Sequence, residues 1–241
     1  MKTTIIGLGR FGYCLAKILQ SQFEINFIDT QAIECQLPQI DYPQLVESDH
    51  VFLCVPINQL QSTLEKITPY LKKGATVLDT CSVKLLPCQW MTSILPNNVE
   101  LIATHPLFGP DSEQAIHTII MHPLRCDDDR FNFWVDTFKS FNLEPHQMAP
   151  EKHDQTIGVT QSLTHYIGRL LGGISRPDTC YQTLGYQKLC DVQQQTCHDQ
   201  WQLFMDILKF NPYNKALLNA IENQQQSLQT VLNSSEVEHG Q

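Results

Sequence analysis

The chain has 241 residues, of which 42% are hydrophobic, and its formal net charge at pH 7 is −9. This length and apolar content are enough for a buried core in one larger and one smaller domain, and they exclude a disordered chain. The negative charge, without any dense run of Lys or Arg, argues against nucleic acid and anionic membrane surfaces as partners.

Short apolar runs alternate with helical stretches through the first half of the chain. This alternation is typical of βαβ units that build a parallel sheet buried on both faces. Two further strands are predicted at His117–Met121 and Leu143–Met148, with a helix at Phe131–Phe141 between them. The earlier expected strands are Thr3–Ile6, Ile25–Ile28, Val51–Val55, Thr76–Leu78 and Leu101–Ala103, and Leu15–Gln20 belongs to the first helix.

Near Pro150 the strand signals give way to Gln-rich amphipathic helices. We therefore expect an α/β domain over residues 1–149 and an all-helical domain over residues 150–241. About 90 residues of helix make a thin core, so this part is expected to pack on the first domain or on a second copy, as a homodimer. The expected helices are Asp154–Leu171, Thr179–Gln195, Trp201–Leu208 and Lys215–Leu232, before a frayed end at Asn233–Gln241.

The nine cysteines are scattered without a C-x-x-C pair, and the N-terminus shows no secretory signal. This usage is typical of reduced thiols, so we expect a cytoplasmic protein. Cys197 next to His198 provides too few ligands at a suitable spacing to indicate a metal, and no metal site is expected. No apolar run reaches the roughly 18 residues that a membrane span needs.

A glycine motif follows the first expected strand and opens the first helix. Gly7, Gly9 and Gly12 form G-x-G-x-x-G, with Arg10 and Phe11 before the last glycine. The first glycine permits a tight turn, the second lets the backbone approach a pyrophosphate, and the third lets helix and strand pack closely. The helix N-terminus then offers N–H groups and a partial positive charge to the phosphates. The motif predicts a doubly wound dinucleotide-binding sheet of the Rossmann type.

Asp29 ends the second expected strand, about 20 positions after the motif. A carboxylate there accepts hydrogen bonds from the ribose hydroxyls of NAD and repels the 2′-phosphate of NADP. No Arg or Lys follows within several residues, so NAD is the expected cofactor and NADP the alternative. Val55 and Pro56, after the third strand, are expected near the middle of the cofactor. A simpler interpretation stays open, in which the glycines serve only a turn and Asp29 caps a helix.

Two strand ends carry side chains suited to proton transfer. Ser82 and Lys84 follow the strand that ends at Asp79, and His105 lies at the end of the next strand. Because ligands bind at the carboxyl ends of strands in such sheets, these residues are placed to face a nicotinamide. The pKa of a histidine lies near neutrality, so His105 suits a general base that Ser82 assists. Helix capping by Ser82, a loop hydrogen bond by His105 and a solvated Lys84 are the simpler interpretations.

The same segments resemble the signature of prephenate and arogenate dehydrogenases, and the resemblance extends over nearly the whole chain. The Thr183–Tyr186 and Leu208–Pro212 stretches are most similar to the arogenate-using branch. The other segments that carry the resemblance are Asp79–Lys84 (DTCSVK), His105–Pro110 (HPLFGP), His153-Asp154 and Gln161–His165 (QSLTH).

The resemblance implies the oxidative decarboxylation of a small anionic cyclohexadienyl substrate, prephenate or arogenate, in tyrosine biosynthesis. Hydride leaves the carbon that bears the ring hydroxyl, carbon dioxide is lost, and the ring becomes aromatic. His105 takes the proton of that hydroxyl and Ser82 assists, a general-base contribution of about 10²–10⁴ in rate. The residues implied to line the substrate pocket are Lys84, His153, Gln161, Thr164 and His165.

One departure from the family concerns the substrate side chain. Prephenate-specific members carry an Arg for its carboxylate at the position of Gln195, and no Arg follows Arg176 here. An amide cannot reproduce bidentate recognition by a guanidinium. Either Lys188, Arg169 or a partner chain supplies the missing group, or the substrate is arogenate, which carries an amino acid there. Arogenate users often prefer NADP, whereas Asp29 favours NAD, so both substrates stay open.

Two other functions share part of the pattern. A β-hydroxyacid dehydrogenase would have the glycine motif and a helical second domain, but the helix after Asp154 lacks the catalytic Lys of that class. A non-catalytic nicotinamide-binding regulatory protein would account for Gln195. The presence of both Ser82 and His105 counts against it.

Overall fold

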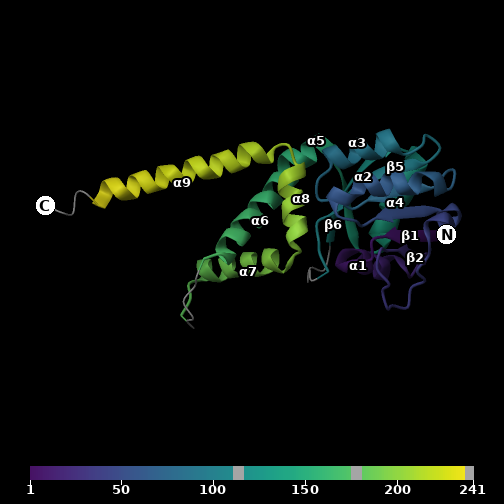
Figure 1. Ribbon diagram of the computed structural model, residues 1–241, viewed down its shortest axis with the longest axis horizontal. Coiled ribbons are helices and arrows are strands. Elements are labelled where there is room, and N and C mark those ends of the chain that lie inside the picture. The colour runs from purple at the N-terminus through teal and green to yellow at the C-terminus, as the bar shows by residue number, and fades with distance from the viewer. Residues whose placement is uncertain (111–116, 175–180, 237–241) are drawn as a thin grey trace. The chain divides into compact units, whose positions relative to one another are not determined.

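A computed structural model of the chain describes residues 1–110, 117–174 and 181–236 (Figure 1). The chain divides into two compact units, Met1–His153 and Asp154–Gln241. The first unit is a sheet covered by helices, and the second is helical in its described part. The expected combination of a doubly wound α/β domain with a helical domain is confirmed. None of the described helices is long and apolar enough to cross a membrane.

The seven strands found in the described residues form one sheet in the order β2-β1-β3-β4-β5-β6-β7. Strands β1 to β5 run parallel, β6 is antiparallel to β5, and β7 is parallel to β6. All four residues of β3 and of β4 are buried, as expected of parallel strands between two helical layers. The strands are β1 (Lys2–Ile6), β2 (Glu24–Ile28), β3 (His50–Leu53), β4 (Thr76–Asp79), β5 (Glu100–Pro106), β6 (His117–Arg125) and β7 (Leu143–Gln147).

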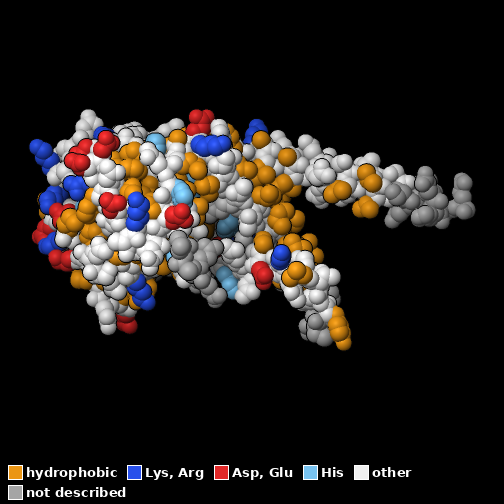
Figure 2. Space-filling view, turned by 180° about the vertical axis from the view of Figure 1, so that it is seen from behind, with side chains coloured by type: hydrophobic (Ala, Val, Ile, Leu, Met, Phe, Trp, Pro, Cys, Tyr) orange, Lys and Arg blue, Asp and Glu red, His pale blue; other side chains and the backbone are white. Residues whose placement is uncertain are grey.

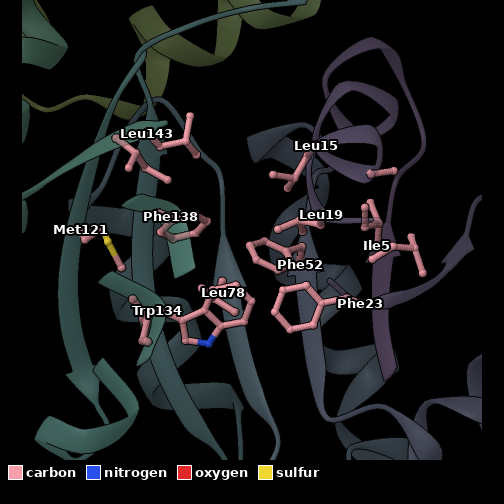
Figure 3. Packing of buried hydrophobic residues seen from close by; sticks show 14 of the residues in the cluster. Ile5, Leu15, Leu19, Phe23, Phe52, Leu78, Met121, Trp134, Phe138 and Leu143 are labelled. Carbon is pink, nitrogen blue, oxygen red and sulfur yellow. The ribbon is translucent and has the colours of Figure 1, made fainter. Parts of the chain in front are cut away.

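Two helices cover one face of the sheet. Leu19 of α1 (Arg10–Leu19) and Trp134 and Phe138 of α4 (Asp128–Ser140) belong to one buried cluster with residues of the central strands (Figure 3). Right-handed crossovers that run in opposite directions along a sheet place their helices on opposite faces. Helices α2 (Ile57–Ile67) and α3 (Leu85–Ile94), which pack against each other, therefore cover the other face.

Several predicted boundaries in the first unit move because of partners distant in sequence. β5 was expected to end at Ala103 but continues through Pro106, because the antiparallel β6 pairs His105 with Ile120. β3 ends at Leu53 rather than Val55. The short helix α5 (Pro150–His153), expected to open the helical domain, packs against α3 within the first unit.

In the second unit, α6 packs against the other three long helices. A Cβ on Gly168 would lie 2.0 Å from the Thr196 hydroxyl, so this glycine lets α6 and α7 approach closely. A π-helical turn, Asp154–Gly158, interrupts the expected helix Asp154–Leu171. The start of the expected helix Thr179–Gln195 and the end of the expected frayed tail, 237–241, lie outside the described residues. The helices are α6 (Val159–Gly172), α7 (Leu184–His198), α8 (Trp201–Phe210) and α9 (Asn214–Glu236).

Candidate functional site

The three motif glycines are used in different ways. Gly7 has a φ of +91°, and a Cβ there would meet the carbonyl oxygen of Cys54 at 2.6 Å. A Cβ on Gly12 would lie 2.0 Å from the carbonyl oxygen of Gly7. Around Gly9, in contrast, a Cβ would meet nothing within 4 Å. Packing inside the protein requires the first and third glycines, and the second faces open space, as the approach of a pyrophosphate requires.

The glycine turn is tied to the end of β2 by Asp29. Its carboxylate accepts hydrogen bonds from the backbone N–H groups of Leu8 (2.8 Å) and Gln31 (3.0 Å). Asp29 is half-buried, and an ionised carboxylate offers about four acceptor sites, so it can accept ribose hydroxyls as well. Helix α1 begins after Gly9, which has no side chain to cap it, so the helix N-terminus can serve a phosphate.

Residues after β3 and in α1 complete the nucleotide side of the site. Val55 and Pro56 are half-buried in the turn before α2, and the Val55 side chain lies against Gly7. The rings of Phe11 and Phe108 pack with their centroids 5.9 Å apart. Arg10 is exposed. The structure therefore brings the predicted cofactor residues together around one turn.

The candidate catalytic residues lie at the same edge of the sheet. The half-buried Ser82 follows β4, and the buried His105 is the second-to-last residue of β5. Because β1, β3, β4 and β5 are parallel neighbours, their carboxyl ends meet at the edge that carries the glycine turn.

His105 forms a pair with a second histidine of the first unit. The Nδ1 atom of His105 lies 2.8 Å from Nε2 of His153, and the rings meet edge to face with centroids 5.0 Å apart. Both side chains are buried. Burial, followed by the charges of His153 and Lys84, holds the pKa of His105 well below its usual value, so the ring is neutral at pH 7. The sequence indicated both residues but not their contact.

Lys84 does not face solvent. Its ammonium is buried, forms an ion pair with the carboxylate of Asp79, and donates to the carbonyl oxygen of Thr104 at 2.5 Å. Burial opposes the charge of Lys84, but the attraction of Asp79 outweighs it, so its pKa lies above the usual value. The interpretation of Lys84 as a solvated loop lysine is wrong, because Asp79 supplies a buried countercharge.

Three polar side chains of α6 stand four residues apart, on one face of the helix. The Gln161 Oε1, His165 Nδ1 and Arg169 Nε atoms are buried without a hydrogen-bond partner. His165 is buried, with its Nε2 at 3.9 Å from the Asp199 carboxylate. The Thr164 hydroxyl donates to the carbonyl oxygen of Thr160 (2.9 Å), within its own helix.

Arg169 takes part in more interactions at this site than the sequence alone indicated. One of its terminal N–H groups donates to the carbonyl oxygen of Asp199 at 2.5 Å, and its guanidinium stacks over the Trp201 ring at 5.2 Å. Gln195, where the resemblance implied an Arg in prephenate-specific members, is exposed on α7, as is Lys188. The spacing of Gln161, His165 and Arg169 was the available sequence signal.

Across the described residues, no group of three or more potential metal ligands gathers.

A doubly wound sheet with an open glycine turn and an acidic residue after β2 defines a dinucleotide-binding domain of the dehydrogenase class. Residues 26–118 match the family model "Prephenate dehydrogenase, nucleotide-binding domain", and residues 170–241 match "TYRAAT1-like, C-terminal domain". Over residues 26–118 the chain is thus similar to the nucleotide-binding domain of the prephenate dehydrogenase family.

Two curated relatives and two solved structures agree with this assignment. The chain is 27% identical to arogenate dehydrogenase 1 of Arabidopsis thaliana, over 92% of its own length and 38% of the relative's. It is 23% identical to a probable arogenate/prephenate dehydrogenase of Methanocaldococcus jannaschii, over 80% of its length and 45% of the relative's. The chain thus spans less than half the length of these two relatives.

The solved structures share the fold. Prephenate dehydrogenase from Aquifex aeolicus, in complex with hydroxyphenyl propionate and NAD+, has a TM-score of 0.74 at 22% identity, covering 99% of this chain and 93% of that one. Synechocystis arogenate dehydrogenase has a TM-score of 0.69 at 20% identity, covering 100% of this chain and 94% of that one. The similarity includes the helical part.

Proposed function

We propose that the chain catalyses the NAD-dependent oxidative decarboxylation of prephenate or arogenate, a step of tyrosine biosynthesis. The observation that carries the proposal is the buried His105–His153 pair at the sheet edge that holds the glycine turn. The names of the Arabidopsis and Methanocaldococcus relatives support the substrate class, and the bound NAD+ of the Aquifex structure supports the cofactor.

His105 acts as the general base in this proposal. Its Nδ1 is engaged by His153, so Nε2 is the ring atom that accepts the proton of the substrate's ring hydroxyl. That role requires the Nδ1–H tautomer, in which His105 donates to Nε2 of His153. The electron pair of the deprotonated hydroxyl forms the carbonyl and expels hydride from the same carbon, while the ring carboxylate leaves as carbon dioxide. Nicotinamide, when bound, supplies the hydride acceptor.

The cofactor proposed is NAD rather than NADP. Asp29 keeps a carboxylate at the end of β2 beside the glycine turn, where it would accept ribose hydroxyls and repel a 2′-phosphate. The first Lys or Arg after it in the sequence is Lys66, on α2. The residues proposed to hold the cofactor are Gly7, Gly9, Arg10, Phe11, Gly12, Asp29, Val55 and Pro56.

Substrate binding is assigned to the helical unit, residues 150–241 in the expected division. Buried polar atoms without partners on Gln161, His165 and Arg169 support this assignment, because native structures rarely leave such atoms unsatisfied and a polar ligand would satisfy them. The substrate's side chain carries a carboxylate, and Arg169 is the described guanidinium on this face. His153 serves His105 in this proposal instead of contacting the substrate directly.

A homodimer through the helical unit is also proposed. Every side chain described from Glu222 to Ser234 of α9 is exposed. Leu228, Val231 and Leu232 are exposed by 56%, 57% and 66% of their surface. Hydrophobic side chains are visible on the surface of α9 (Figure 2). An apolar stripe on the exposed part of a helix is stabilised when a second copy covers it.

The first test is the formation of reduced nicotinamide with four combinations, prephenate or L-arogenate with NAD or NADP. Replacing His105 with Asn should lower turnover by about a hundredfold or more, because general-base assistance is lost. The matched control is His146→Asn on β7, an exposed histidine, which should keep full activity. NAD binding without turnover of either substrate would favour the regulatory-protein alternative instead.

A further inference from the structure

A buried ion pair lies beneath the candidate catalytic residues. The ammonium of Lys84 contacts the carboxylate of Asp79, and both side chains are almost fully buried. A buried ion pair contributes little to stability compared with apolar residues of the same size, because desolvation offsets the attraction. This pair therefore calls for a role other than stability.

The ion pair forms hydrogen bonds with the backbone of the residue that precedes each candidate catalytic residue. Asp79 accepts the backbone N–H of Cys81 at 3.0 Å and that of Thr104 at 3.1 Å. Lys84 donates to the carbonyl oxygen of Thr104 at 2.5 Å, so both backbone polar groups of that residue are held. The Thr104 hydroxyl in turn donates to the carbonyl oxygen of Asp79. Cys81 directly precedes Ser82, and Thr104 directly precedes His105.

We propose that Lys84 is a positioning residue for His105 and Ser82: with Asp79 it fixes the backbone just before each of them and does not bind the substrate. This inference rests on the proposed function. It replaces the expectation from the sequence that Lys84 contacts the substrate. Its ammonium already has an anionic partner and a carbonyl partner inside the protein.

The charge of Lys84 also acts on His105. Apart from burial, His153 and Lys84 are the groups that lower the pKa of His105. Removing the positive charge should therefore raise the pKa of His105, the more so because Asp79 is left unpaired. Removing both charges together should return it toward the wild-type value. A residue with a purely structural role would not change this titration.

The test compares Lys84→Met with Lys84→Arg, Asp79→Asn/Lys84→Met and Lys72→Met. Lys72 is a matched control, because it forms an exposed ion pair with Asp49 at 2.6 Å. We expect Lys84→Met to lower kcat by about a hundredfold, since a misplacement of about 1 Å costs about that factor. KM and the Kd for NAD should stay within about threefold of wild type, Lys84→Arg should recover part of kcat, and Lys72→Met should change neither.

The titration of His105, followed by NMR with ¹⁵N-labelled histidine, gives a readout that needs no turnover. The midpoint of this titration should rise in Lys84→Met and fall back in the double variant. The double variant leaves no unpaired buried charge, so it provides the test if the single variant fails to fold. An increase in KM at unchanged kcat would overturn the proposal in favour of substrate binding. An unchanged kcat, or a loss explained by the unfolded fraction with unchanged titration, would overturn it as well. If wild type turns over neither substrate, the proposed function fails, whereas the titration still tests the Lys84–His105 coupling.

Discussion

In the proposed function, the partner of His105 determines what kind of base this histidine can be. A carboxylate beside an imidazole favours the charged ring and raises its pKa, whereas a buried second imidazole does not. His153 therefore orients His105 while leaving it unprotonated through the neutral range. The protonated form is disfavoured after the reaction, so the proton is released readily. This arrangement suits a base that must be free of a proton before the substrate hydroxyl arrives.

The choice of cofactor can be tested at Asp29. Replacing Asp29 with Asn should raise the Kd for NAD by about tenfold or more, because hydrogen bonds to a charged acceptor contribute about 1.5–3 kcal/mol. The Kd for NADP should rise less or fall, because the repulsion of the 2′-phosphate is removed. Titration calorimetry with both cofactors measures the difference, with the exposed Asp136→Asn as control. Equal losses for both would mean that Asn loosens the glycine turn through Leu8.

Side-chain partners were less predictable than residue types. The sequence indicated His105, His153 and Lys84 through motifs, but their contacts depend on strand pairing and on the fold of α5. Asp79 and Lys84, of opposite charge and five positions apart, gave a signal for the ion pair. That signal could not be distinguished from two solvated residues without knowing that β5 covers them.

At the scale of elements, the parallel strands were predictable because their apolar runs reflect burial on both faces. The end of β5 was not, since it is set by the antiparallel strand β6, which pairs residues up to Pro106. The π-helical turn Asp154–Gly158 was likewise missed. It is held from outside the helix, where the Asn211 amide donates to the Asp154 carbonyl oxygen at 2.9 Å, and Gly158 leaves room for that amide.

The proposed homodimer can be tested at the exposed part of α9. Replacing Leu228 and Leu232 with Gln should convert the proposed dimer to a monomer, because the apolar stripe would no longer favour contact with a second copy. Size-exclusion chromatography with light scattering measures the mass. The matched control replaces Gln224 and Gln225, exposed in the same stretch, with Ala. A monomeric wild type would contradict the dimer, and a dimer that persists in the Leu variant would place the interface elsewhere.

For the whole molecule, the net charge of −9 works against the proposed anionic substrate, so positive groups must act locally. The Lys84 ammonium is neutralised by Asp79, and Gln195 carries no charge. In the proposed function, the N-terminus of α1 acts on the cofactor and Arg169 on α6 acts on the substrate. The positive groups proposed for the cofactor and for the substrate therefore belong to different units.

The molecule also contains several histidines that are buried in the neutral form. Burial lowers the pKa of His50, His105 and His165, and partial burial lowers that of His122. In the unfolded chain these rings take up protons near pH 6.5, but in the folded protein they do so only at lower pH. Between those values the unfolded state binds more protons, so stability falls as the pH falls. Protonation of these histidines should therefore contribute to acid unfolding, in addition to protonation of the carboxylates.

His50 gives the sharpest test of this effect. It lies in the aromatic cluster with Phe23, Phe133 and Trp134, and burial, then the charge of Arg130, lowers its pKa to about 4. Its contribution is complete above pH 6.5 and is lost as the pH falls toward 4, a change of about 3 kcal/mol in the free energy of unfolding. In His50→Phe, which keeps an aromatic ring, that loss should disappear.

Denaturant unfolding followed by tryptophan fluorescence, at several pH values between 7 and about 4, measures the difference. The free energies of wild type and His50→Phe should converge or cross as the pH falls, because only wild type must expose a ring that takes up a proton. His146→Phe, at an exposed histidine of β7, is the matched control for the loss of an imidazole. Parallel curves for His50→Phe would mean that the aromatic cluster opens to water before it unfolds, so that His50 titrates in the folded protein.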